Sequence, residues 1–353
     1  MSRYFSEKYR TLVPYTPGEQ PKERAYIKLN TNESPFPPSL KAIAEAREAA
    51  NALQLYSDPT ASRLHKALAA TYGCREDMIL ATNGSDEILN YAFMAFCDEE
   101  HPAVFADITY GFYEVFAEIN RVPYRKIPLK SDLSIDVEAF TGLRATVFLA
   151  NPNAPTGLYL PLSKVEAIVR STDGVVVVDE AYIDFGSESA ITLLDCYENL
   201  LITRTFSKSR SMAGARLGFG IANPELIADL NAMKYATNPY NVNAMTQAAG
   251  IGCLEDEDYT EKNCQAIIEN RLYLNEALTA LGFFLTDSKA NFVFARHPDL
   301  SGEALYRLLR EKGILVRHFK TPRIEDYLRI TVGSRAECEA LVTALTEITL
   351  STV

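Results

Sequence analysis

The chain has 353 residues, of which 47% are hydrophobic and 23% are charged, and its formal net charge at pH 7 is −11. This composition is typical of a globular protein with a large core, and the length predicts one large domain together with a smaller one. The acidic balance argues against nonspecific binding to nucleic acid, because neutralising phosphates requires a surplus of Lys and Arg.

The sequence also argues against a membrane protein and against a metal-binding protein. No apolar run reaches the roughly 18 residues that cross a bilayer, and the first ten residues, M-S-R-Y-F-S-E-K-Y-R, lack the apolar region of a signal peptide. We therefore expect a cytoplasmic protein without membrane contact. The six cysteines are scattered with no C-x-x-C pair, which predicts reduced thiols and no metal site.

Taken in chain order, residues 1–38 are predicted to form an arm, because six prolines interrupt any regular element and only 26–29 alternates like a short strand. Helices follow at 39–53, with Ser39 as N-cap, and at 61–72, which ends at Gly73.

A unit then recurs, in which a short apolar run leads into a turn of small or polar residues and, in most cases, on to a helix. The apolar runs are 78–81, 103–106, 146–150, 175–178 and 200–202. Runs without polar alternation are typical of parallel strands buried on both faces, and alternation with helices predicts a large, doubly wound, mostly parallel α/β sheet. The polar turns should gather at the carboxyl edge of that sheet.

Beyond Gly220 the pattern changes. Helices are predicted at 224–235, 243–254 and 259–281, and strands at 291–295, 313–316 and 327–332. These elements indicate a smaller α+β domain, so the predicted organisation is an arm (1–38), a large domain (39–255) and a small C-terminal domain (256–353).

Asp179 closes the apolar run 175–178, and a carboxylate there is costly unless it meets a cation or a metal. The string V-V-V-V-D-E also resembles the acidic strand of P-loop ATPases, but no Gly-Lys pair exists to form the phosphate loop. A dinucleotide site is disfavoured as well, because Gly250-Ile251-Gly252 follows a predicted helix rather than a strand.

Lys208 lies just past the run 200–202, at the end of another predicted strand. A lysine and an aspartate at two strand ends of one sheet suit pyridoxal 5′-phosphate: the lysine binds the cofactor aldehyde, and the aspartate keeps the pyridine nitrogen protonated. Such a lysine also carries protons between carbon atoms. The helix opened by Gly84-Ser85-Asp86 would bind the phosphate at its N-terminus, Ser207 and Arg216 flank Lys208, and Tyr110 would stack on the ring.

Seven motifs in a fixed order extend this interpretation. They are L-N-T-N-E-S-P, G-S-D-E-I, T-Y-G-F-Y, N-P-N-A-P-T-G, V-D-E-A-Y-I-D-F, T-F-S-K-S-R-S-M-A-G-A-R-L-G-F and L-R-I-T-V-G-S-R-A-E. On these, and over nearly its whole length, the chain resembles the pyridoxal-phosphate aminotransferases of fold type I, the aspartate aminotransferase superfamily. Within that superfamily it is most similar to the histidinol-phosphate aminotransferase family.

The resemblance implies roles for individual residues. Lys208 is the lysine that binds the cofactor, Asp179 the partner of the pyridine nitrogen, Tyr182 a donor to the ring oxygen and Tyr110 the stacking ring. Further positions match the phosphate end of the cofactor (Gly84, Ser85, Asp86, Ser207, Arg216), the anionic end of the substrate (Arg317, Arg329) and N-terminal substrate contacts (Tyr15, Asn32). Asp86 can serve the phosphate only through its backbone N–H or as a helix cap. Tyr56 matches a tyrosine that reaches the cofactor phosphate of a second subunit, which implies a homodimer with shared sites.

One position departs from the family pattern. An asparagine often precedes the proline of P-T-G and points at the ring oxygen, whereas this chain has Ala154 there and Asn153 before it. Either Asn153 takes over the contact, which we favour, or the ring oxygen depends more on Tyr182.

The activity expected from the resemblance is amino transfer between L-histidinol phosphate and 2-oxoglutarate, a step of histidine biosynthesis. Its small-molecule substrates would be a phosphorylated amine and a 2-oxo acid. Two alternatives on the same fold stay open, an aromatic amino acid aminotransferase and a threonine-phosphate decarboxylase. A catalytically silent binding or regulatory protein is the alternative from another class, which the intact pair of Lys208 and Asp179 disfavours.

Overall fold

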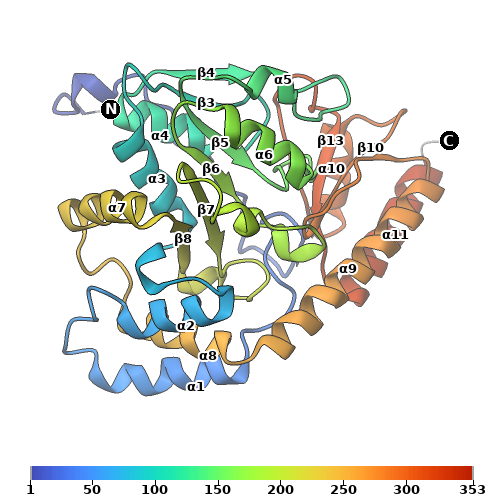
Figure 1. Ribbon diagram of the computed structural model, residues 1–353. Coiled ribbons are helices and arrows are strands. Elements are labelled where there is room, and N and C mark those ends of the chain that lie inside the picture. The colour runs from blue at the N-terminus through green and yellow to red at the C-terminus, as the bar shows by residue number, and fades with distance from the viewer. Residues whose placement is uncertain (1, 352–353) are drawn as a thin grey trace.

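The computed structural model describes residues 2–351 as two sheet-and-helix assemblies joined by one long helix, α9 (Figure 1). The helices are α1 (Leu40–Ala49), α2 (Ser62–Tyr72), α3 (Ser85–Phe96), α4 (Phe112–Asn120), α5 (Val137–Phe140), α6 (Leu162–Ser171), α7 (Pro224–Thr237), α8 (Ala244–Leu254), α9 (Glu257–Ala280), α10 (Gly302–Glu311) and α11 (Arg335–Leu350). The strands are β1 (Ile27–Lys28), β2 (Ile79–Thr82), β3 (Ala103–Ala106), β4 (Tyr124–Ile127), β5 (Thr146–Ala150), β6 (Val176–Asp179), β7 (Leu200–Thr205), β8 (Gly218–Ala222), β9 (Phe284–Leu285), β10 (Phe292–Arg296), β11 (Ile314–Leu315), β12 (Arg317–His318) and β13 (Tyr327–Thr331).

The larger sheet has seven strands in the order β2-β8-β7-β6-β5-β3-β4. Its neighbours pair in parallel from β7 through to β4, and β8 is antiparallel to both β2 and β7. The prediction of a large, mostly parallel α/β sheet is therefore confirmed. Because β5, β6 and β7 are adjacent and parallel, their carboxyl ends meet at one edge of the sheet.

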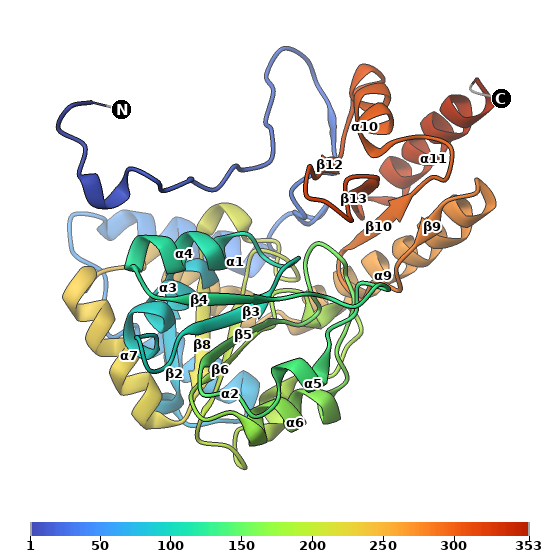
Figure 2. The same ribbon diagram turned by 90° about the horizontal axis from the view of Figure 1, so that it is seen from above.

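Both faces of this sheet are covered, as Figures 1 and 2 show. Successive strand residues alternate between two apolar clusters: Val176 and Val178 pack on the side of α2, α6 and α8, and Val177 packs on the side of α3, α4 and α7. Phe93 of α3 stacks on Phe148 of β5 with ring centroids 4.0 Å apart. Burial on both faces explains why these strands read as unbroken apolar runs.

Most predicted elements appear within a few residues of their expected bounds, but two strands of the large sheet were missed. β4 has the sequence Y-R-K-I and lies at the sheet edge with its middle exposed, so it carries no apolar run. β8 has the sequence G-F-G-I-A, and its glycines remove the β-branched signal. Gly218 is required there, because a Cβ would come within 2.3 Å of the backbone N of Ser85.

The C-terminal part forms a four-stranded antiparallel sheet in the order β12-β13-β10-β9, packed against α9, α10 and α11. The predicted arm joins this part: β1 pairs in parallel with β11, with Ile27 opposite Ile314. In Figure 2 the chain before β1 runs as an extended strap from the large assembly towards α10 and β12. The division into domains at residues 38 and 255 stays a proposal.

Among residues 2–351, no helix is both long and apolar enough to span a membrane. Within the same residues, no cluster of three or more His, Cys, Asp or Glu side chains is arranged to hold a metal ion.

Candidate active site

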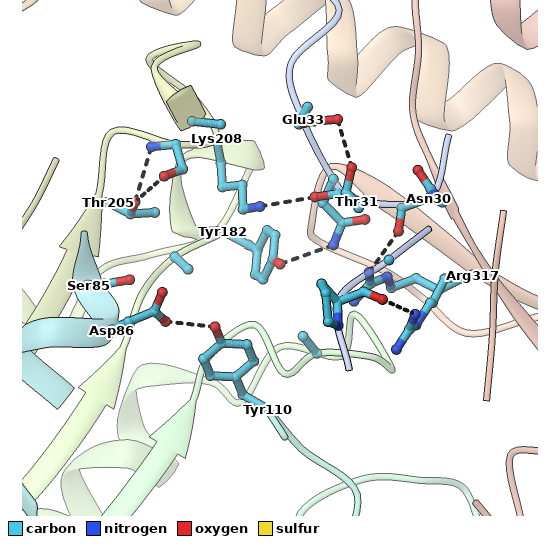
Figure 3. Close-up of a pocket in the computed structure, with 18 of the residues that line it drawn as sticks. Asn30, Thr31, Glu33, Ser85, Asp86, Tyr110, Tyr182, Thr205, Lys208 and Arg317 are labelled. Carbon is cyan, nitrogen blue, oxygen red and sulfur yellow. Dashed lines mark hydrogen bonds between the residues drawn. The ribbon is translucent and has the colours of Figure 1, made fainter. Parts of the chain in front are cut away.

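A cavity of about 430 Å³ lies at the carboxyl edge of the large sheet, a size usual for small-molecule sites. Its floor comes from the ends of β5, β6 and β7 and the start of α3, its far wall from β12 and β13, and its cover from the segments around Tyr15 and Asn32. The structure brings twelve sequence-predicted residues to this cavity: Tyr15, Asn32, Ser85, Asp86, Tyr110, Asp179, Tyr182, Ser207, Lys208, Arg216, Arg317 and Arg329. Figure 3 shows the arrangement.

Lys208 extends into the cavity from the turn after β7. The backbone N–H of Ser207 donates to Oγ1 of Thr205 (3.1 Å), which anchors the turn, and Nζ of Lys208 donates to the carbonyl of Thr31 (3.3 Å). Burial lowers the pKa of Lys208 to about 8, and the guanidinium of Arg329 acts in the same direction. A lysine with this pKa supplies a substantial fraction of neutral, nucleophilic amine near neutral pH.

Asp179 is 5% exposed and ends β6 beside the lysine turn. Its carboxylate accepts hydrogen bonds from the Tyr113 hydroxyl (3.1 Å), the Ala181 N–H (3.2 Å) and the Thr203 hydroxyl (3.3 Å). Burial raises the pKa of Asp179 to about 6 against the effect of these donors. Within residues 2–351 all three donors to this carboxylate are neutral and no cation pairs with it, so a protonated ring nitrogen would complete its environment.

The opposite end of the cavity floor is the start of α3. Gly84 precedes the helix with φ 79°, and Ser85 is its first residue. A Cβ at Gly84 would come within 2.5 Å of Nη2 of Arg216, so the glycine lets that guanidinium approach the helix start. Backbone N–H groups at a helix N-terminus and an arginine together suit a phosphate.

Asp86 links this end to the ring side of the cavity. It accepts a hydrogen bond from the Tyr110 hydroxyl (2.7 Å) and forms an ion pair with Arg216 (3.0 Å). The carboxylate therefore orients Tyr110 and Arg216, and its negative charge makes it unsuitable as a direct ligand of a phosphate.

Tyr182 lies between the lysine and the N-terminal segment. Its hydroxyl accepts a hydrogen bond from Nδ2 of Asn32 (3.0 Å), and its ring centroid lies 5.7 Å from Nζ of Lys208. Asn32 adopts φ 56° and is fixed by Thr331 of β13, whose hydroxyl accepts from its N–H (2.9 Å).

Arg317 and Arg329 are paired neighbours on the antiparallel strands β12 and β13. Arg317 donates to the carbonyls of Thr16 (2.9 Å) and Pro17 (3.2 Å), and Arg329 donates to the carbonyl of Asn30 (3.2 Å). Nε of Arg329 is buried without a hydrogen-bond partner in the described part of the chain. Two guanidinium groups with unused donors form a site for an anion at the end of the cavity.

Tyr15 joins the arm to the cavity. Its ring stacks on Phe112 with centroids 4.3 Å apart and lies 6.3 Å from Tyr110.

Three sequence-predicted residues lie outside the cavity. Asn153 uses its amide within the protein, accepting from the Thr109 hydroxyl (2.8 Å) and donating to the carbonyl of Ile108 and to Thr156 (both 3.0 Å), whereas Ala154 lines the cavity. The geometry therefore does not support our expectation that Asn153 replaces the missing asparagine. Gly84 does not line the cavity; it precedes Ser85 at the start of α3 and leaves room for the Arg216 guanidinium. Tyr56 is 83% exposed and stacks on Tyr240, away from the cavity of its own chain.

Sequence reasoning missed several residues of the site. Tyr113 and Thr203 hold Asp179, and Thr31 and Glu33 surround the lysine amine, with Glu33 accepting from the Thr31 hydroxyl (2.7 Å) and from Lys28. Thr31 and Glu33 stand inside the motif L-N-T-N-E-S-P, which was the available signal. Tyr113 likewise stands inside the motif T-Y-G-F-Y, whereas Thr203 lies outside every motif and 24 residues from Asp179, so the sequence offered no signal for it.

The cavity fits the cofactor expected from the sequence. A lysine amine, a buried carboxylate with neutral donors and a helix start beside an arginine lie around one space, and they suit the aldehyde, the ring nitrogen and the phosphate of pyridoxal 5′-phosphate, respectively. The pair of Arg317 and Arg329 lines the same cavity and is not part of this set.

Comparison with known proteins agrees with this chemistry. Residues 24–345 match the family model for aminotransferase class I and II. The chain is 45% identical to histidinol-phosphate aminotransferase 2 of Dechloromonas aromatica over 99% of its own length and 100% of that protein, and 45% identical to histidinol-phosphate aminotransferase 1 of Pseudomonas aeruginosa over 98% and 99%.

Solved structures give the same result at lower identity. A putative histidinol-phosphate aminotransferase from Erwinia carotovora atroseptica superposes with a TM-score of 0.85 at 27% identity, covering 96% of this chain and 99% of that one. Histidinol-phosphate aminotransferase from Sinorhizobium meliloti, solved in complex with pyridoxal-5′-phosphate, gives a TM-score of 0.85 at 26% identity and covers 94% and 93%.

Proposed function

The chain belongs to the class I and II aminotransferases, and we propose from this premise that it transfers an amino group from L-histidinol phosphate to 2-oxoglutarate with pyridoxal 5′-phosphate as cofactor. The observation that carries the substrate proposal is the cross-strand pair of Arg317 and Arg329, which faces the cavity across from Lys208. One such pair can bind the phosphate of the amino donor and the carboxylate of the 2-oxo acid in turn, because a guanidinium forms bidentate hydrogen bonds with either group.

The residues around the cofactor divide the chemistry between them. When bound, pyridoxal phosphate carries the amino group between the two substrates and withdraws electrons into its ring. Asp179 keeps the proton on the ring nitrogen, and Lys208 moves a proton to and from the substrate carbon that bears the amino group. Tyr110 covers the ring. Tyr182 holds the ring oxygen, a role that Ala154 cannot share because it has no polar side chain.

Steady-state rates with histidinol phosphate, phenylalanine and threonine phosphate test this proposal on the purified protein. We expect kcat/KM with histidinol phosphate to be more than about tenfold above that with phenylalanine, since binding the phosphate uses both arginines. A preference for phenylalanine of that size would instead support an aromatic aminotransferase, and release of CO₂ from threonine phosphate would support the decarboxylase.

A catalytically silent protein would differ in its spectrum. The purified protein should show the visible absorbance of lysine-bound cofactor, and Lys208→Ala should remove that band. A sample without it, unaffected by Lys208→Ala, would support a binding or regulatory role.

We also propose a homodimer with shared sites. The exposed Tyr56, stacked on Tyr240, lies where it does not reach its own cavity, and the proposal gives it the cofactor phosphate of a second subunit. Light scattering should give twice the chain mass of 39.3 kDa, and Tyr56→Phe should weaken cofactor binding without changing that mass. The cytoplasmic location expected from the sequence likewise stays a proposal, and cell fractionation tests it.

A further inference from the structure

A mostly buried group of charged and hydroxyl side chains adjoins Asp179 and Lys208 in the chain, and the amino-transfer chemistry does not use it. We call it the Arg204 cluster; it consists of Glu180, Asp184, Arg204 and Ser209. Arg204 on β7 donates to Oε2 of Glu180 through Nε (3.1 Å) and pairs with it through Nη2 (3.0 Å), and its Nη1 donates to Oδ1 of Asp184 (2.9 Å). The Ser209 hydroxyl donates to Oδ2 of Asp184 (2.5 Å).

The cluster is fully bonded where it is most buried. The side chain of Glu180 is 0% exposed, and it also accepts from the Ser189 hydroxyl (2.6 Å) and the Ala190 N–H (2.7 Å). Tyr72 lies over the Arg204 guanidinium, 5.1 Å from the ring centroid. Such complete satisfaction is what makes a buried ion pair rigid, because any displacement leaves a charge without partners.

The position of the cluster in the chain connects it to the reaction. Glu180 directly follows Asp179, and Ser209 directly follows Lys208. The two residues that meet the cofactor are thus each one peptide away from a member of the cluster, and Arg204 with Asp184 bridges them. The Ser209–Asp184 bond ties the lysine turn to the loop that follows β6 by side chains alone.

The bond between Ser209 and Asp184 is not needed to satisfy a buried charge. About a third of the Asp184 side chain is exposed, so water could satisfy it without Ser209. The lysine turn also has its own internal bonds, from the N–H of Met212 to the carbonyl of Phe206 (3.0 Å) and from the N–H of Ser211 to the carbonyl of Lys208 (3.3 Å). The Ser209–Asp184 bond therefore serves to fix the position of the lysine turn relative to the loop that follows β6.

We propose that Arg204, Asp184 and Ser209 are positioning residues that fix Lys208 relative to Asp179, so that amine and carboxylate meet one cofactor ring with the separation that proton transfer requires. This inference rests on the proposed function in that both residues act on the same bound cofactor. Small misplacements of a proton-transferring group are costly to rate and nearly neutral to substrate binding, and the arginine pair that binds substrate lies on other strands.

The test compares Ser209→Ala and Asp184→Asn with the unaltered holoenzyme. We expect kcat to fall about tenfold in each, with KM held within about twofold, since the proton-transfer geometry changes and the anion site does not. The pH midpoint of the bound cofactor's visible absorbance should shift, although the charged groups facing Lys208, namely Arg329, Glu33, Asp86 and Arg216, are unaltered. The double variant should be no worse than Asp184→Asn alone, because that change already weakens the Ser209–Asp184 bond, together with the Arg204–Asp184 ion pair.

Two further variants separate positioning from general damage. Ser209→Thr keeps the hydroxyl and should restore kcat and the absorbance midpoint. Glu166→Gln removes a carboxylate that accepts from the Tyr197 hydroxyl (2.9 Å) on the remote helix α6, and it should leave both readouts unchanged.

Native kcat and a native absorbance midpoint in both Ser209→Ala and Asp184→Asn would overturn the inference. So would losses that match a drop in melting temperature and vanish on cooling, which would mean a purely structural cluster. The absorbance midpoint needs no substrate, so it tests positioning even if the substrate panel contradicts histidinol phosphate.

Discussion

Asp179 and Glu180 are consecutive carboxylates at the end of one strand, and both are buried, yet their surroundings differ. Glu180 pairs with Arg204, whereas the partners of Asp179 in the described part of the chain are two hydroxyls and one backbone N–H. For Asp179, burial raises the pKa to about 6, and the hydrogen bonds from Tyr113, Ala181 and Thr203 that oppose this rise come from neutral donors. A carboxylate that the fold leaves without a cation is the one available to a ligand, whereas the paired neighbour holds the fold together.

The largest effect should come from the functional side of this comparison. Lys208→Ala should lower the rate of amino transfer by about 10³-fold or more, because the general acid–base group and the covalent attachment point are both lost. It should not destabilise the protein, since it removes a buried amine whose pKa burial already lowers to about 8. Rates and thermal unfolding of the same sample check both parts, and Lys208→Arg should lose activity equally.

Changes at the paired carboxylate, Glu180, should instead lower the stability of the fold. Arg204→Leu should lower the free energy of unfolding by about 3–5 kcal/mol, because it leaves Glu180 buried and unpaired. Denaturant titration measures this value. Arg144→Leu, which removes an exposed pair with Glu100, is the matched control and should cost less than about 1 kcal/mol. A small effect at Arg204 would remove the distinction between the two carboxylates.

Asp179→Asn should change how the stability of the cofactor-free protein depends on pH. The pKa of Asp179 is about 6 in the fold against an ordinary 3.8, so the folded state binds the extra proton between these values. Its contribution to the stability of the cofactor-free protein is fully present below pH 4 and is lost as pH rises through 6, by about 3 kcal/mol in total.

The cofactor-free Asp179→Asn protein should therefore match the parent near pH 4 and exceed it in stability near pH 7. His65 acts in the opposite direction over the same range, because burial lowers its pKa to about 4, but it cancels in the difference between the two proteins. Binding of pyridoxal phosphate should be weakened at pH 7. A variant no more stable than the parent at pH 7 would contradict an uncompensated carboxylate.

The smallest effect is expected from Tyr113→Phe. Removing a hydroxyl that lowers the pKa of Asp179 should raise that pKa further. As pH is lowered, the carboxylate should therefore become protonated, and cofactor affinity should fall, at a higher pH than in the parent. The loss of one hydrogen bond to a charged group corresponds to about 1.5–3 kcal/mol at most. Fluorescence titration with cofactor from pH 5 to 8 measures the midpoint, and Tyr197→Phe is a control that keeps Asp179 unchanged.

A residue of the site could be predicted from the sequence where it stands next to an apolar run or inside a motif. Lys208, Asp179 and Ser85 follow apolar runs, so the sheet topology alone brings them to one edge. Tyr113 does not: it lies in the second position of α4 and reaches Asp179 only because α4 packs on the sheet. Asn153 shows the reverse error, since motif position suggested a ligand and the loop's own hydrogen bonds used its amide. The missed strands β4 and β8 failed for composition, being charged and glycine-rich.

The pairing of β1 with β11 joins residues 27–28 to residues 314–315. It sets the segment that carries Thr31, Asn32 and Glu33 into the C-terminal part, and the carbonyl of Leu29 accepts from the N–H of Thr331 (2.9 Å). During synthesis, the large sheet with Lys208 and Asp179 can form while this wall still lacks its partner strand. The ribosome must deliver almost the entire chain before the cavity closes, so the nascent protein completes its binding site as one of its last acts of folding.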